Sequence, residues 1–178
     1  MTGIGHCLVL VGFRGAGKTT LGRMVADRSS VPFVDTDWVV EELAEASIHE
    51  IFTKRGEGAF RELEREVVTT LEPLRPVVIA AGGGTVMDPD CRASLERLGT
   101  VIWLEAPAST LAARIDESIR PSLTGRPIAE EVAEVLAARE STYEAMSSHR
   151  VSTADRTPEE VCDELQRLWG SPPDHDIR

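Results

Sequence analysis

The residues with the clearest chemical role lie near the start of the chain, in the segment GFRGAGKTT at residues 12–20. The segment matches the spacing G-x-x-x-x-G-K-[S/T] through Gly12, Gly17, Lys18 and Thr19. In this pattern backbone N–H groups of a tight turn surround phosphates, the lysine reaches the outer phosphates and the hydroxyl binds Mg²⁺. An apolar run precedes the segment and a helical pattern follows it, which disfavours an ordinary glycine-rich turn. We therefore predict a nucleoside-triphosphate site.

Three further segments carry groups that suit an acceptor site beside those phosphates. Asp35 and Asp37 follow a short apolar run, so one carboxylate can support Mg²⁺ while the other orients or deprotonates a hydroxyl. Glycines at 82–84 let the backbone approach a ligand closely. Arg61 lies in a helical pattern, and a guanidinium pairs with a carboxylate in bidentate fashion. Two alternatives stay open: Asp37 caps the helix that follows it, and Arg61 is a solvated residue or a helix ion pair.

The elements that must position these groups alternate between short β-branched runs and longer amphipathic patterns. The expected strands are 7–11, 32–35, 77–80, 101–104 and 149–152. Later helices are expected at 128–146 and 158–169. This alternation predicts an α/β fold with a five-stranded parallel sheet flanked by helices. Ligands of such sheets bind outside the carboxyl ends of the strands.

Three segments are expected to lie outside this sheet. Residues 36–72 show helical spacing over a longer stretch than a crossover helix needs, which predicts a helical substrate-binding segment. Residues 116–127 are polar, contain two prolines and are expected to form a lid loop. The tail at 171–178 is expected to be disordered. Residues 1–170 have the length of a single domain.

Net charge and composition exclude several classes of function. The chain has 178 residues and a formal charge of −11, which disfavours a general binder of nucleic acid or of anionic membranes. Its 19 basic residues are 17 arginines and two lysines, a bias that codon usage or a need to bind forked anions would explain. The three cysteines are widely spaced and no apolar run is long enough to span a membrane. We expect a soluble, cytoplasmic monomer.

The kind of nucleotide enzyme follows from what the chain lacks. It contains no asparagine, so the guanine-reading N-K-x-D element of GTPases is not present. Its length leaves no room for an additional motor domain. A small kinase fits better, because phosphoryl transfer needs mainly positioning and charge neutralisation.

Together these motifs resemble the shikimate kinase family over nearly the whole chain. The resemblance rests on the combination, since the phosphate loop alone is generic. The shared residues are the loop itself, Asp35 and Asp37, the run Gly58-Ala-Phe60-Arg61-x-x-Glu64, the glycines at 82–84, Arg120-Pro121, and Arg139 before Tyr143. The run at 120–127 is similar to the lid of one bacterial isoenzyme type.

The resemblance implies a three-layer P-loop kinase fold and phosphorylation of the 3-hydroxyl of shikimate by ATP with Mg²⁺. The ATP-binding residues that it implies are Gly15, Ala16, Gly17, Lys18, Thr19, Thr20, Arg114, Arg120 and Arg156. The shikimate-binding residues that it implies are Asp37, Arg61, Gly82, Gly83, Gly84 and Arg139. Thr19 and Asp35 are then expected to hold the metal, and Lys18, Asp37 and Arg120 to serve catalysis. Of these, Arg114 is also compatible with a solvated helix position, and the loop of Arg156 is the least constrained by motif.

Two rival interpretations are weaker. A sugar-acid kinase of the gluconate type also needs a carboxylate-binding site, but it lacks this pairing of Asp37, Arg61 and the glycine triplet. A relative that binds nucleotide without catalysis is expected to have lost Lys18, Asp37 or Arg120, and all three are present. The basic residues are expected to converge on one cleft, while most acids, such as those at 130–134, are expected to lie on helix faces.

Overall fold

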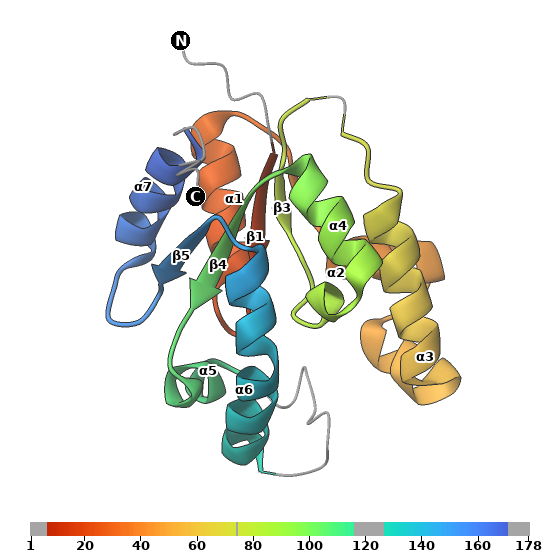
Figure 1. Cartoon of the computed structure of the whole chain (residues 1–178). Coiled ribbons are helices and arrows are strands. Elements are labelled where there is room, and N and C mark those ends of the chain that lie inside the picture. Colours follow the sequence, from red (N-terminus) through yellow and green to blue (C-terminus); the bar gives the residue numbers. More distant parts are fainter. Residues whose placement is uncertain (1–6, 74, 116–126, 171–178) are drawn as a thin grey trace.

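One parallel sheet organises the molecule (Figure 1). The computed structural model describes residues 7–73, 75–115 and 127–170. Within these ranges the sheet has five strands in the order β2-β3-β1-β4-β5. The strands are β1 (Cys7–Val11), β2 (Phe33–Asp35), β3 (Val78–Ala80), β4 (Gly99–Glu105) and β5 (His149–Ser152). The predicted fold is confirmed, but β4 is longer than expected, because Gly99 pairs with Cys7 and Glu105 pairs with Ser152.

Helices follow the strands and cover both faces of the sheet, as Figure 1 shows. In the described ranges they are α1 (Lys18–Ser29), α2 (Thr36–Ala44), α3 (Ile48–Thr69), α4 (Pro89–Leu98), α5 (Ala108–Arg114), α6 (Ile128–Met146) and α7 (Pro158–Trp169), with a short 3₁₀ helix, η1 (Thr85–Met87). The expected helices at 128–146 and 158–169 are confirmed at both ends. None of the helices in these ranges is long and apolar enough to cross a membrane.

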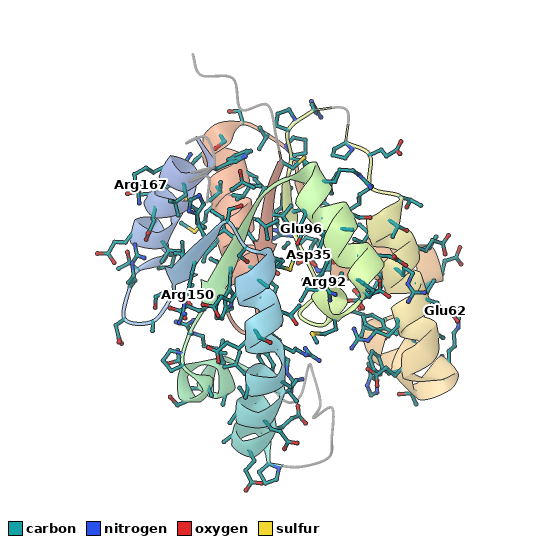
Figure 2. The ribbon with its side chains drawn as sticks, viewed as in Figure 1. Asp35, Glu62, Arg92, Glu96, Arg150 and Arg167 are labelled. Atoms are coloured by element: carbon teal, nitrogen blue, oxygen red, sulfur yellow. The ribbon has the colours of Figure 1, made fainter. Side chains whose placement is uncertain are left out.

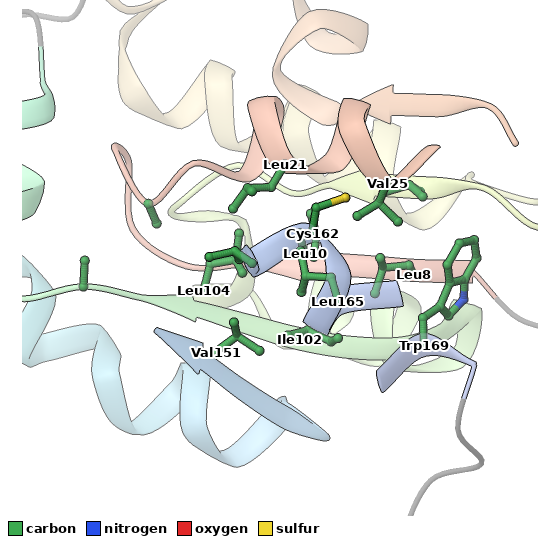
Figure 3. Packing of buried hydrophobic residues seen from close by; sticks show 14 of the residues in the cluster. Leu8, Leu10, Leu21, Val25, Ile102, Leu104, Val151, Cys162, Leu165 and Trp169 are labelled. Atoms are coloured by element: carbon green, nitrogen blue, oxygen red, sulfur yellow. The ribbon is translucent and has the colours of Figure 1, made fainter. Parts of the chain in front are cut away.

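Two apolar clusters hold the layers together, one on each face of the sheet. On one face Leu8 and Leu10 of β1 pack against α1 and α7, where Leu21 and Leu165 are buried (Figure 3). On the other face Val9 packs against α4 and α6. This alternation follows from the strand itself, since successive side chains point to opposite faces. Because both faces are covered, β1 is apolar along its whole length.

The three cysteines are distributed over this core. Cys7 lies in β1, Cys91 in α4 and Cys162 in α7. All three are buried free thiols rather than disulfides. Burial raises the pKa of each thiol, and for Cys91 the value is about 12.

The segment predicted to be helical at 36–72 contains α2 and α3, which pack on each other beside the sheet. Their shared core is a third cluster of buried residues, Val40, Ile51, Phe60 and Val67. Ser47 begins α3 with a reciprocal capping box to Glu50. Gly56 interrupts α3 with φ 81°, a conformation that glycine adopts at little cost.

Strand register determines where the candidate site lies. Ala80 of β3 is level with Leu10 of β1 on one side and with Asp35 of β2 on the other. The segments that leave these three parallel strands therefore meet at one edge of the sheet. They are the phosphate loop, the Asp35–Asp37 segment and the glycine triplet.

Two predictions concern residues that the structure does not describe. The expected lid at 116–127 is described only at Pro127, so Arg120 lies outside the described residues. The tail at 171–178 also lies outside them.

Candidate active site

The phosphate loop joins β1 to α1 and requires glycine at several points. At Gly12, with φ 138°, an added Cβ would lie 2.3 Å from the carbonyl oxygen of Leu104. Gly17 has φ 92° and caps the N-terminus of α1. A side chain at either position would disrupt the turn, because the first lacks space and both occupy the left-handed region. The loop therefore places backbone N–H groups and the start of a twelve-residue helix around one point, which is the geometry of an anion site.

Lys18 is held over this loop by the loop's own backbone. Its ammonium nitrogen donates hydrogen bonds to the carbonyl oxygens of Gly12 at 2.8 Å and Phe13 at 3.0 Å. These contacts keep a long, flexible side chain beside the turn instead of in solvent. A positive charge is thus fixed at the point where the sequence predicts phosphates.

Thr19 and Asp35 join the loop to the end of β2. The Thr19 hydroxyl donates to Oδ2 of Asp35 at 2.7 Å, and the backbone N–H of Asp37 donates to Oδ1 at 3.1 Å. Asp35 is therefore the N-cap of α2, so the alternative that Asp37 caps this helix is wrong. Burial raises the pKa of the Asp35 carboxyl, and the hydrogen bond from Thr19 opposes part of that shift. Figure 2 shows Asp35 in the interior, whereas Glu62 and Arg167 lie at the periphery.

This pair suits a hard cation. Because Thr19 gives its proton to Asp35, the lone pairs of the hydroxyl oxygen are available to a metal. The described residues contain no group of three or more His, Cys, Asp or Glu side chains arranged to hold a metal ion. A site with one hydroxyl and one supporting carboxylate fits Mg²⁺, which keeps several waters and takes its other ligands from phosphates.

The glycine triplet is hemmed in by polar side chains from other elements. An added Cβ at Gly82 would lie 2.7 Å from Oδ1 of Asp37, Oε1 of Glu64 and Oγ1 of Thr85. The backbone N–H of Gly82 donates to the Thr36 hydroxyl at 2.9 Å. The triplet therefore brings the Asp37 carboxylate, buried at 9% exposure, next to groups from α3 and η1.

Arg61 approaches the triplet from α3. Its guanidinium donates to Glu64 at 2.6 Å and to Glu57 at 3.2 and 3.3 Å. An added Cβ at Gly84 would lie 2.6 Å from this guanidinium, so glycine is needed there. The interpretation of Arg61 as a helix ion pair is thus correct, and the same pairs hold it against the triplet. Glu64 also accepts from the Thr85 hydroxyl, and its burial raises the pKa of the Glu64 carboxyl.

Arg139 approaches the triplet from α6, which follows the triplet in the sequence, whereas Arg61 comes from α3, which precedes it. Its guanidinium donates to the carbonyl oxygen of Gly83 at 3.1 Å. The Tyr143 hydroxyl, one helical turn further on, donates to the same oxygen at 2.5 Å. Arg61 and Arg139 therefore contact neighbouring residues of one loop although 78 positions separate them in sequence.

A second pair of arginines lies on the other side of the phosphate loop. Arg114, at the end of α5, donates to the Thr153 hydroxyl at 3.0 Å and to its carbonyl oxygen at 2.9 Å. Arg156 pairs with Glu164 at 2.5 Å and donates to the backbone of Ser152 at 3.3 Å. Both side chains have specific partners, so neither is simply solvated.

These parts enclose a cleft of about 630 Å³. Among the predicted residues, those that line it are Gly15, Ala16, Gly17, Lys18, Thr19, Thr20, Asp35, Asp37, Gly83, Arg114 and Arg156. The cleft is not lined by four of the predicted residues, which lie next to its lining residue Gly83: Arg61, Gly82, Gly84 and Arg139. The cleft has the volume of a small-molecule site.

Sequence reasoning missed several residues of this region. Arg14 lines the cleft and pairs with Glu131, which is buried at 1% exposure. Glu131 lies on a helix among the acids at 130–134, as expected, but it is buried because it pairs with Arg14 of the phosphate loop. Thr85 and Thr153 were also missed, since isolated threonines carry no spacing signal. Glu64 was named as part of the family run but was given no role, although it lies three residues after Arg61 on a helix and pairs with it.

The sheet order, the phosphate loop and the adjoining cleft define a P-loop kinase. A family model described as shikimate kinase matches residues 14–169. A shikimate kinase of Thermosynechococcus vestitus is 41% identical over 162 residues, covering 90% of this chain and 88% of the relative. The chain therefore belongs to the shikimate kinase family. Among solved structures, shikimate kinase from Acinetobacter baumannii in complex with shikimate superposes with TM-score 0.87 at 29% identity, covering 92% of both chains.

The rival sugar-acid interpretation finds less support. A gluconokinase from Sinorhizobium meliloti has TM-score 0.56 and 17% identity, covering 93% of this chain and 92% of its own. That likeness shows a common fold and nothing about the substrate.

Proposed function

We propose that this protein transfers the γ-phosphoryl group of ATP to the 3-hydroxyl of shikimate, as part of aromatic amino-acid biosynthesis. One observation carries the proposal: two guanidiniums converge on the glycine triplet beside Asp37, next to a phosphate loop. Shikimate offers a carboxylate for the guanidiniums and hydroxyls for the aspartate. A bidentate guanidinium–carboxylate pair orients a ring in a way that a lysine cannot.

The nucleotide side of the cleft is assigned to ATP. The backbone of the loop from Gly15 to Thr20 would hold the phosphates, and Lys18 would move from the loop carbonyls to a phosphate oxygen. Arg114 and Arg156 would line the remainder of the nucleotide site. Thr19 would bind Mg²⁺, with Asp35 supporting it. When bound, Mg²⁺ neutralises charge on the phosphate oxygens.

Asp37 is assigned to the acceptor hydroxyl. Its carboxylate is buried beside the Gly82 backbone, where an added Cβ would lie 2.7 Å from its Oδ1. Phosphoryl transfer passes through a loose transition state, so the attacking hydroxyl loses its proton late. Asp37 therefore acts mainly by holding the hydroxyl in line and then accepting its proton. Arg120, which lies outside the described residues, is assigned to the transferring phosphoryl group by family resemblance.

The test is ADP release from Mg-ATP with shikimate, with gluconate and with no acceptor. Product mass and ³¹P resonance identify the phosphorylated hydroxyl. We expect rapid ADP release with shikimate alone and a single monophosphate product. Release that does not depend on the acceptor, or none with shikimate, would refute the proposal. Lys18→Ala, checked for folding by circular dichroism, is the inactive control. The monomeric state and cytoplasmic location expected from the sequence stay predictions.

A further inference from the structure

Tyr143 shares an acceptor with a proposed substrate-binding arginine. Arg139 and Tyr143 lie one turn apart on α6 and both donate to the carbonyl oxygen of Gly83. A carbonyl oxygen has two lone pairs, so these two donors can satisfy it completely. The hydrogen bond from Tyr143 is the shorter, at 2.5 Å against 3.1 Å.

The tyrosine ring is itself fixed. Tyr143 has no exposed surface, and its ring stacks on Trp103 of β4 with 5.8 Å between centroids and 26° between planes. A side chain packed in this way has one available orientation, and its hydroxyl points at one acceptor. Burial raises the pKa of Tyr143 to about 12, which keeps the hydroxyl protonated and able to donate at neutral pH.

Gly83 is held from its other side by the phosphate loop. An added Cβ there would lie 3.3 Å from the backbone nitrogen of Arg14 and 3.5 Å from the carbonyl oxygen of Gly12. The Gly83 peptide is therefore confined between that loop and α6. Loss of either donor on α6 would leave its carbonyl partly unpaired and able to rotate.

We propose that Tyr143 is a positioning residue for the acceptor substrate: its hydroxyl holds the Gly83 carbonyl in the orientation against which the Arg139 guanidinium is seated. This inference rests on the proposed function, in which Arg139 binds the shikimate carboxylate. Tyr143 touches neither substrate in this account. It acts through the carbonyl and the guanidinium, and therefore on shikimate binding more than on the transfer step.

The first experiment compares Tyr143→Phe with the wild type. This substitution removes one hydroxyl and keeps the ring on Trp103. We expect the KM for shikimate to rise about three- to ten-fold, as loss of one buried hydrogen bond implies. The kcat and the KM for ATP should stay within about two-fold. Ser147→Ala is the matched control, because it removes a hydroxyl at the C-terminal cap of α6 that donates to the Tyr143 carbonyl at 2.7 Å, and it should leave the KM for shikimate unchanged.

A double-mutant cycle separates positioning from a structural role. If Tyr143 acts through Arg139, Tyr143→Phe should raise the KM for shikimate much less in an Arg139→Lys background than in the wild type. An equal rise in both backgrounds, or an unchanged KM in Tyr143→Phe alone, would overturn the inference. Thermal unfolding is measured for each variant, and kinetics are compared at a temperature where all are folded. Failure of the proposed function is a different result, because the wild type itself would then not phosphorylate shikimate.

Discussion

The guanidinium of Arg14 and the carboxylate of Glu131 form an ion pair that joins the phosphate loop to the first turn of α6. The Glu131 carboxylate is fully buried, and the Arg14 side chain is 11% exposed. Removing one partner of a buried ion pair costs about 3–5 kcal/mol. We therefore expect Glu131→Gln to lower the unfolding midpoint by roughly 10 °C. Calorimetry measures this, with the exposed Glu144→Gln on the same helix as the control; equal midpoints for the two variants would contradict the expectation.

The carboxylate-binding pair gives a kinetic prediction. Arg61→Ala and Arg139→Ala should each weaken shikimate binding by about 2–4 kcal/mol, because each removes one of the two charged partners proposed for the substrate carboxylate. The KM for shikimate should rise by roughly 30- to 900-fold while the KM for ATP changes little. Arg65→Ala on α3, an exposed arginine that pairs with Asp88, is the control. Wild-type KM for shikimate in both variants would exclude this carboxylate site.

Asp35 gives a metal-dependence prediction. The two carboxylate oxygens of Asp35 accept separate hydrogen bonds, from the Thr19 hydroxyl and from the Asp37 backbone N–H. Asp35→Asn keeps one acceptor oxygen and lacks the negative charge. We expect the Mg²⁺ concentration for half-maximal activity to rise about 10- to 100-fold, as for other residues that support a metal ligand. Asp88→Asn is the matched control, because Asp88 also caps a helix, α4. If the Mg²⁺ concentration for half-maximal activity rose equally in both variants, the effect would come from the loss of a helix cap and not from metal binding.

Glu64 gives a pH prediction for stability. Burial raises the pKa of its carboxyl above the ordinary 4.5, so the folded state binds this proton more tightly than the unfolded state. The contribution of Glu64 to the free energy of unfolding is therefore complete below about pH 4.5 and is lost as pH rises through the folded-state pKa. The difference in the free energy of unfolding between the wild type and Glu64→Gln, measured with urea from pH 4 upward, should decrease as pH rises. A difference that increases with pH would show that the Arg61 pair outweighs burial.

Arg120 gives a prediction about the transfer step. Loss of a cation that neutralises charge only in the transition state lowers kcat and kcat/KM together. We expect Arg120→Ala to lower kcat by a factor of about 10³ or more, as for other arginines in phosphoryl transfer. Arg126→Ala, in the same segment, should have a much smaller effect. Single-turnover kinetics check this, and a wild-type kcat would remove Arg120 from the mechanism.

The parts of the fold that were predictable from sequence are those with local signals. β1 has the expected bounds because a continuous apolar run marks it, and α6 has them because a preceding proline and helical periodicity mark it. The phosphate loop was predictable because Gly12 and Gly17 meet a steric requirement that few other residues satisfy. The family resemblance added the grouping of Arg61 and Arg139, which no local pattern links.

The remaining features depend on tertiary contacts. Glu131 reads as one acid among several on an amphipathic helix, and only the docking of α6 on the phosphate loop buries it. Asp35 rather than Asp37 caps α2, because the helix begins two residues earlier than the sequence pattern indicated. The role of Tyr143 depends on a carbonyl 60 positions away. Such pairs have no spacing rule, so they emerge only when the sheet brings the segments together.

The three buried thiols allow local unfolding of the protein to be measured through their reaction with a thiol reagent. Cys7 lies in the central strand, whereas Cys91 and Cys162 lie in helices on opposite faces of the sheet. Their raised pKa values and burial make them unreactive in the folded state, since the thiolate is the nucleophile. Single-cysteine variants treated with a thiol reagent would thus time the separate exposure of the central strand and of each helical layer. A change in these thiol-labelling rates would also report ligand binding at the cleft, without any added fluorophore.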